Sequence, residues 1–184
     1  MMPATPPLRL PRFRMLVVAA LIAGVGATQV TAATPTPTGP TGDYDTCIGD
    51  TDDDRAIAAC TRAIARDHYR GADQAMLYVS RSVGYLLAGD ADAAIADASA
   101  ALQHHPTEAV AFWSRGSAWQ IKNEPARAIA DFGEALRLDP KDASSLIQRG
   151  IAREAIGDTA GCARDIAEAR RIDPVLTTRK YVRK

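Results

Sequence analysis

The stretches AIADASAAL (residues 94–102) and AIADFGEAL (residues 128–136) are nearly the same text, 34 residues apart. Other columns recur at the same period: Arg81, Arg115 and Arg149; Asp97, Asp131 and Asp165; Ala101, Ala135 and Ala169; Pro106, Pro140 and Pro174. Four independent columns at one period indicate a true internal repeat. A period of this length is typical of solenoids, in which each unit stacks on the next.

Within each repeat the apolar residues have helical rather than alternating spacing. One helix is expected around residues 77–86 and the next around residues 94–102. Gly89-Asp90, Asn123-Glu124-Pro125 and Gly157-Asp158 supply tight turns, because glycine ends a helix, aspartate caps the next one and proline fits its first turn. The sequence therefore predicts an all-α fold built from helix–turn–helix pairs.

These residues resemble the tetratricopeptide repeat, whose pattern combines large, small, aromatic, alanine and proline positions at fixed offsets. The second unit, 109–142, matches it with Phe112, Gly116, Trp119, Ala128, Phe132, Ala135 and Pro140. Units 75–108 and 143–176 match it too, although the third has Arg153 at the aromatic position and Cys162 at an alanine position. The resemblance implies a right-handed α-solenoid of about 3.5 repeats, with a repeat domain over residues 43–174.

A partial unit, 43–70, precedes these three, because AIAACTRAI (56–64) overlays AIADASAAL. In the register of the family, Cys47 and Cys60 then face one another across a helix pair. The resemblance therefore implies a Cys47–Cys60 disulfide that fastens a truncated first helix to a full second one. The alternative is two unpaired buried thiols. Cys162 is left over, at a small-residue position that indicates burial.

In this family the first helix of each pair lines a concave groove. The register places nine candidate peptide-binding residues there, Met76, Val79, Val83, Val110, Trp113, Ser117, Gln120, Ile147 and Ile151, together with Leu86, Leu87, Ile121, Ser144, Glu154 and Ala155. The basic clamp that some members use for peptide carboxyl termini is absent, which favours an extended or helical apolar ligand. Trp113 is expected in the groove and Trp119 in the core; the alternative is that this apolar surface packs on neighbouring repeats.

No catalytic, cofactor-binding or metal-binding set is found in the sequence, and we expect no enzyme. His104 and His105 end a helix, where cationic side chains face terminal carbonyls. The acidic run 50–54 lacks the central glycine and the distal glutamate of a calcium loop, and helix N-terminal acids explain it better. The repeated Arg and Asp columns are expected to pair with one another as structural contacts.

The N-terminus has the three parts of a signal peptide: Arg9, Arg12 and Arg14, an apolar run over 15–27, and small residues before a cut near Ala33. An uncleaved anchor is the alternative. Residues 34–42 form an uncharged Pro/Thr/Gly leader, and residues 177–184 a basic tail. The 22 basic residues balance 22 acidic ones, and this balance disfavours a nucleic-acid partner.

The sequence therefore predicts an exported protein, periplasmic or secreted, with no stable membrane span after signal cleavage. It would act as a non-catalytic adaptor that binds a protein or peptide. Two alternatives remain: an envelope redox or stress-related factor that uses Cys47 and Cys60 reversibly, and a self-associating structural module that forms homo-oligomers.

Overall fold

The computed structural model describes residues 41–175, and all of its regular structure there is helical. The helices are α2 (Thr41–Gly49), α3 (Asp53–Ala65), α4 (Gly71–Ala88), α5 (Ala91–His104), α6 (Ala109–Ile121), α7 (Pro125–Leu138), α8 (Ala143–Ala155) and α9 (Thr159–Ile172). The predicted signal peptide, most of the leader and the basic tail lie outside the described residues.

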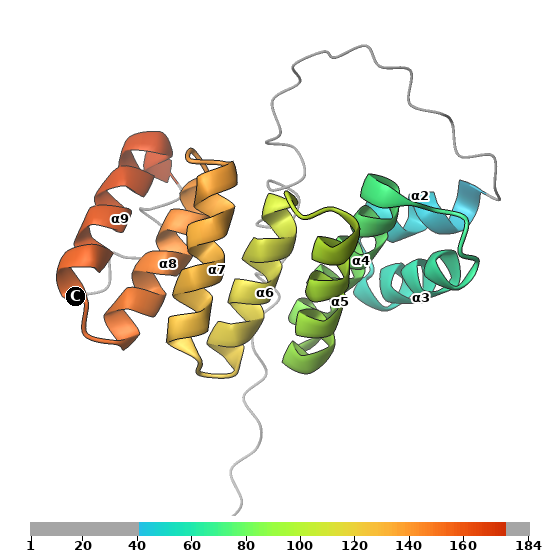
Figure 1. The fold of residues 1–184 in the computed structure, drawn as a ribbon, viewed down its shortest axis with the longest axis horizontal. Coiled ribbons are helices and arrows are strands. Elements are labelled where there is room, and N and C mark those ends of the chain that lie inside the picture. The colour runs from blue at the N-terminus through green and yellow to red at the C-terminus, as the bar shows by residue number, and fades with distance from the viewer. Residues whose placement is uncertain (1–40, 176–184) are drawn as a thin grey trace, which may run out of the picture. The chain divides into compact units, whose positions relative to one another are not determined.

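The helices form consecutive pairs, α2–α3, α4–α5, α6–α7 and α8–α9, stacked in chain order (Figure 1). The first helix of each pair also contacts the first helix of the next, so α2, α4, α6 and α8 are neighbours in one layer. This all-α arrangement confirms the predicted helical solenoid. Helix α4 begins at Gly71, earlier than the predicted unit boundary at residue 75.

The turns inside the pairs follow from their residues. Gly89 ends α4 in the left-handed region with φ 83°, where a Cβ would be strained. Asp90 then caps α5 by accepting a hydrogen bond from the Ala93 amide, and Asp158 caps α9 in the same way through the Gly161 amide. Pro125 occupies the first turn of α7, where its missing N–H costs nothing.

The core is a chain of small clusters between adjacent helices, rich in alanine. Small residues let the backbones approach closely. At Gly116 on α6, a Cβ would lie 2.9 Å from the Phe132 ring of α7, and Phe132 is fully buried. The alanine-rich, aromatic-poor composition is what such close crossings require.

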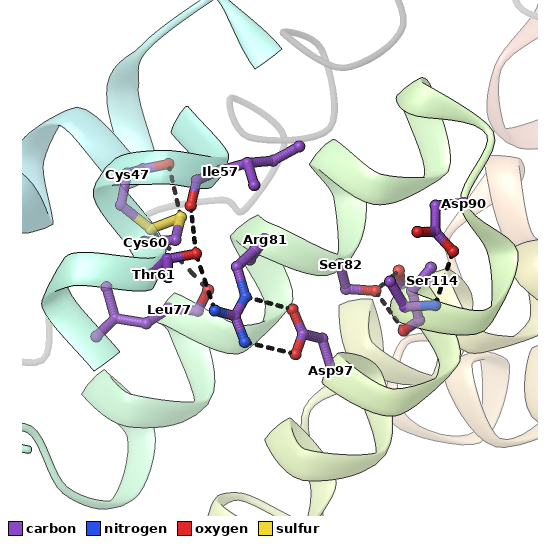
Figure 2. Close-up of polar contacts among 12 residues, drawn as sticks. Cys47, Ile57, Cys60, Thr61, Leu77, Arg81, Ser82, Asp90, Asp97 and Ser114 are labelled. Carbon is purple, nitrogen blue, oxygen red and sulfur yellow. Dashed lines mark hydrogen bonds and ion pairs between the residues drawn. A yellow bond between two sulfur atoms is a disulfide. The ribbon is translucent and has the colours of Figure 1, made fainter. Parts of the chain in front are cut away.

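Buried ion pairs join the two helices of each regular repeat. Arg81 holds Asp97 through two hydrogen bonds of 2.6 and 2.9 Å (Figure 2). Arg115 binds Asp131 and Arg149 binds Asp165 with the same two-point geometry. The aspartates are only 4–6% exposed. The bond to Asp97 raises the pKa of Arg81, and the bond to Asp131 raises that of Arg115, so both stay charged despite burial.

The same arginines also tie neighbouring repeats together. Arg81 donates to Thr61 Oγ1 on α3 at 3.0 Å (Figure 2), and Arg115 donates to Ser99 Oγ on α5 at 3.4 Å. In the third repeat the corresponding position is Gly133, which offers no hydroxyl. There Arg153, the residue that departs from the aromatic pattern, adds a second guanidinium to Asp165 at 2.7 Å.

The structure joins Cys47 of α2 to Cys60 of α3 by a disulfide, across a sequence separation of 13 (Figure 2). Both residues are buried, beside Leu77 of α4 and a stacked pair of rings, Tyr44 and Tyr69, 5.0 Å apart. Asp43 on α2 forms ion pairs with Arg62 of α3 and with Arg66, the residue that follows α3. The short first helix is thus held by a covalent link and by charges at its N-terminal end.

Candidate functional site

A groove of about 440 Å³ is formed by residues of the three first helices α4, α6 and α8 and of the turn after α6. It is lined by Leu86 and Leu87 of α4, Trp113, Ser117, Gln120 and Ile121 of α6, Gln148, Ile151, Ala152 and Ala155 of α8, and Asn123 and Pro125 of the intervening turn. Its position follows from the repeat, because equivalent residues of successive first helices face the same side.

Four of the nine candidate residues line this groove: Trp113, Ser117, Gln120 and Ile151. The expectation is wrong for Val79 and Ile147, which are 5% and 4% exposed and belong to core clusters. Each is buried among neighbouring helices, Val79 beside Ala111 of the next first helix and Ile147 beside Leu136 and Ala169.

The remaining candidates lie elsewhere. Met76 is 41% exposed but does not line the groove, and Val83 and Val110 are half-buried outside it. The groove therefore extends from Trp113 to the turn after α6 and does not follow the first helices over their full length. Asn123, Pro125, Gln148 and Ala152 were not predicted. The turn signal around Asn123 was visible in the sequence, but not its place at the groove.

The two tryptophans do not divide into a groove residue and a core residue as predicted. Trp113 is half-buried, lines the groove and packs against two core clusters, on the α5 side and the α7 side. Its Nε1 is buried without a hydrogen-bond partner among the described residues, so the indole acts as an apolar wall. Trp119 is also half-buried, with the Arg127 guanidinium 4.5 Å from its ring centroid.

The polar residues of the groove are all neutral. The Gln120 amide is oriented by its Nε2, which donates to the Gln148 backbone carbonyl at 3.0 Å. Ser117 donates its hydroxyl proton to the Trp113 carbonyl at 2.9 Å. No side chain that lines the groove carries a formal charge. The groove can therefore offer apolar contact together with amide and hydroxyl hydrogen bonds, but no ion pair.

A second hollow, of about 330 Å³, is formed by residues of α8 and α9. It is lined by Cys162, Ile166, Glu154 and Arg170 among others. Burial, followed by the negative charge of Glu154, raises the pKa of the Cys162 thiol. Since the thiolate is the reactive form, this cysteine is a poor nucleophile.

The arrangement matches solved repeat structures. The chain superposes on MamA with a TM-score of 0.62 at 21% identity, over 71% of this chain and 74% of that one. It superposes on the first tetratricopeptide repeat domain of Spaghetti (RPAP3), solved with an HSP90 peptide, with a TM-score of 0.57 at 21% identity, over 60% and 91%. The chain has the tetratricopeptide repeat fold.

A third structure with the same fold is YrrB, described as having an unusual peptide-binding site, with a TM-score of 0.58 at 15% identity over 69% of this chain and 64% of that one. No family model and no curated protein matches the sequence. The tetratricopeptide repeat assignment thus rests on the structure and on the repeat columns.

The acidic and histidine residues of the tetratricopeptide repeat domain have structural partners. Within residues 41–175, no group of three or more His, Cys, Asp or Glu side chains is placed to hold a metal ion. The acidic run serves helix α3, where Asp52 caps the N-terminus and accepts from the Arg55 amide. His104 stacks on the Tyr78 ring at 5.5 Å. Over the same residues, no helix combines the length and apolar character needed to cross a bilayer.

Proposed function

We propose that this protein is a non-catalytic adaptor that binds a protein or peptide in the groove between α4, α6 and α8. The observation that carries the proposal is the groove itself: an open, preformed, mostly apolar hollow of about 440 Å³ with a tryptophan in its wall. Grooves of this size and composition suit ligand binding, and tryptophan is prominent among the residues that dominate interfaces.

The rigidity of the groove supports this role. The three first helices are held by the Arg81–Asp97, Arg115–Asp131 and Arg149–Asp165 pairs and by close helix crossings. A surface that is already ordered loses little conformational entropy when a ligand binds. The first repeat domain of Spaghetti, which was solved bound to an HSP90 peptide, and YrrB, which has a peptide-binding site, share this fold.

We further propose that the protein is exported to the periplasm or secreted. Residues 1–33 have the charged start, short apolar run and small-residue cleavage site of a signal peptide. The Cys47–Cys60 disulfide supports the same location, since such bonds persist mainly in oxidising compartments. The two cysteines are 3% and 0% exposed, which favours a structural bond over a reversible redox pair.

The experiment is selection of peptides from a display library on purified protein, followed by affinity measurement with two variants. Ile121→Asp places a charge in the groove, where Ile121 is 52% exposed. Ile156→Asp is the matched control, because Ile156 is 54% exposed near the end of α8 and outside the groove.

Peptides that bind the wild type and the Ile156→Asp variant equally, but bind Ile121→Asp about tenfold more weakly or not at all, are the expected result. If the library yields no binder of any composition, the adaptor function is wrong. If binders are insensitive to Ile121→Asp, the groove is not the site.

A further inference from the structure

We propose that Glu124, at the edge of the groove, selects a partner in which a lysine or arginine lies close to the apolar residue that enters the groove. This inference rests on the proposed function and names the charge of the partner. Glu124 is exposed and lies between Asn123 and Pro125, which both line the groove. No charged residue lines the groove itself, so selection by charge depends on the residues at its edge.

The first argument is a structural role that Glu124 lacks. At the 34-residue period, the same position is Asp90 in the first repeat and Asp158 in the third. Asp90 caps its helix by accepting from the Ala93 amide (Figure 2), and Asp158 does so by accepting from the Gly161 amide. Glu124 precedes α7 at this position but makes no side-chain cap hydrogen bond, and glutamate is not among the preferred capping residues. Its carboxylate is therefore available to a ligand.

The second argument is that cations next to the lining residues already have carboxylate partners. Lys122 precedes the lining residue Asn123 in the turn and forms an ion pair with Asp92. On α8, Arg149 and Arg153 follow two lining residues, and both bind Asp165. A ligand carboxylate would have to compete with these aspartates. The groove edge therefore offers little to an acidic partner.

Two carboxylates at the edge remain available. Glu124 on the turn and Glu154, which precedes the lining residue Ala155 on α8, are both exposed and have no ion-pair partner among residues 41–175. The Arg127 guanidinium, one turn into α7, lies instead 4.5 Å from the centroid of the Trp119 ring. A ligand lysine or arginine would gain a partner at this edge, whereas a ligand carboxylate would be repelled.

The charge of the whole domain acts in the same direction. All 22 acidic residues of the chain lie within residues 41–175, whereas 7 of the 22 basic residues lie outside that range. An excess of negative charge attracts a cationic partner over a longer range and speeds its association. The fitting partner therefore has an aliphatic or aromatic residue for contact with Trp113 and Ile151, and a lysine or arginine within a few residues of it.

The test is selection from a random heptapeptide display library on the wild type and on the Glu124→Lys variant. Lysine and arginine should be enriched over aspartate and glutamate among the peptides that the wild type selects, and Glu124→Lys should abolish or reverse this preference. Asp54→Lys is the matched control, because Asp54 is an exposed acid in the first turn of α3, away from the groove. It makes the same change of charge at another helix start and should keep the wild-type preference.

A second measurement isolates the ion pair. By isothermal titration calorimetry, a selected peptide remade with glutamine in place of its basic residue should bind the wild type about threefold more weakly, and with aspartate about tenfold more weakly. Glu124→Gln should remove most of this difference, as a double-mutant cycle requires, and about 1 M salt should reduce it. The melting temperature of Glu124→Gln should equal that of the wild type, because the carboxylate has no partner in the fold.

Several results would overturn the proposal. Peptides selected without a preference for basic residues, or with one that Glu124→Lys leaves intact, would exclude Glu124 as the selecting residue and leave the adaptor function standing; a library without binders would instead refute that function. A preference lost equally in Asp54→Lys would assign it to net charge. Peptide affinity that rises on deletion of residues 177–184 would assign the site to the chain's own basic tail, and concentration-dependent mass in light scattering, abolished by Glu124→Lys, to a second copy.

Discussion

The two helices of the N-terminal pair α2–α3 are held together by different contacts from those in the three regular pairs. In the regular pairs, a half-buried arginine on the first helix holds a buried aspartate on the second. Counted back from Cys47, the corresponding position on α2 is Asp43, which pairs with Arg62 and Arg66 near the surface. The charges are reversed and the burial is lost, and a disulfide stands beside them.

The difference follows from the length of the helices. Helix α2 has 9 residues, against 18 for α4 and 13 for α6 and α8. A short helix has too little apolar surface to hold itself in place, and a covalent link compensates by restricting the unfolded chain. The regular repeats use the same Arg–Asp pair in each unit, whereas the N-terminal end of the stack is held by a disulfide.

Among the changes that test this difference, removal of the disulfide should lower the stability most. The double variant Cys47→Ser/Cys60→Ser is expected to lower the free energy of unfolding by about 3 kcal/mol, the chain-entropy value for a loop of this order. Urea denaturation followed by circular dichroism measures it. Cys162→Ser is the control, since Cys162 forms no disulfide, and should change stability little. A double variant as stable as the wild type would contradict the account of α2.

Loss of one buried pair should rank second. Asp131→Ala removes two hydrogen bonds to the Arg115 guanidinium, at 2.9 and 2.7 Å. The expected cost is about 2 kcal/mol, because these are bonds to a charged group and Arg115 regains only part of its hydration. Glu134→Ala breaks the exposed Arg137–Glu134 pair and should cost less than about 0.5 kcal/mol. Equal losses for the two variants would show that burial of the pair is irrelevant.

Alanine substitutions at two glycines of the second repeat should change the stability by smaller amounts, and the two changes should have opposite signs. Gly116→Ala forces a methyl to within 2.9 Å of the buried Phe132 ring, and overpacking of this kind costs about 1–2 kcal/mol. Gly133→Ala in the same pair meets nothing within 4 Å and should stabilise α7 by about 0.5–1 kcal/mol. Thermal unfolding of both variants measures the difference. A neutral Gly116→Ala would argue against the close crossing.

The smallest expected effect is the pH response of α2. The hydrogen bond from Arg62 lowers the pKa of Asp43. A carboxyl with a lowered pKa stabilises the fold at pH values above its unfolded pKa, near 4, and loses that contribution as the pH falls through its folded pKa. The protection of the α2 amides, taken relative to their intrinsic exchange rate at each pH, should therefore fall below about pH 4. The Asp43→Asn variant should exchange faster at neutral pH and lack this response; an unchanged response would exclude Asp43 as its source.

The sequence predicted the fold because the residues that repeat every 34 positions are the ones that pack the helices together. Gly116, Ala128 and Phe132 meet at the crossing of α6 and α7. The Arg and Asp of each repeat are 16 residues apart because this separation places them opposite one another on the two helices of the pair. Periodicity alone was sufficient here, because each contact recurs between equivalent residues.

The sequence predicted the groove less completely. Val79, Trp113 and Ile147 occupy one repeat column, yet only Trp113 reaches the groove. Whether a column residue is covered depends on its size and on the side chains of neighbouring helices, which differ from repeat to repeat. For the same reason the sequence did not reveal that Gln148 would contribute its backbone carbonyl to orient Gln120.

The most direct test of the central claim is nuclear magnetic resonance mapping of a peptide selected from the display library on isotope-labelled protein. The account predicts that chemical-shift changes concentrate at the residues of α4, α6 and α8 that line the groove, including the Gln120 side-chain amide and the Trp113 indole. Changes confined to α5, α7 and α9, or to the α2–α3 end, would contradict it.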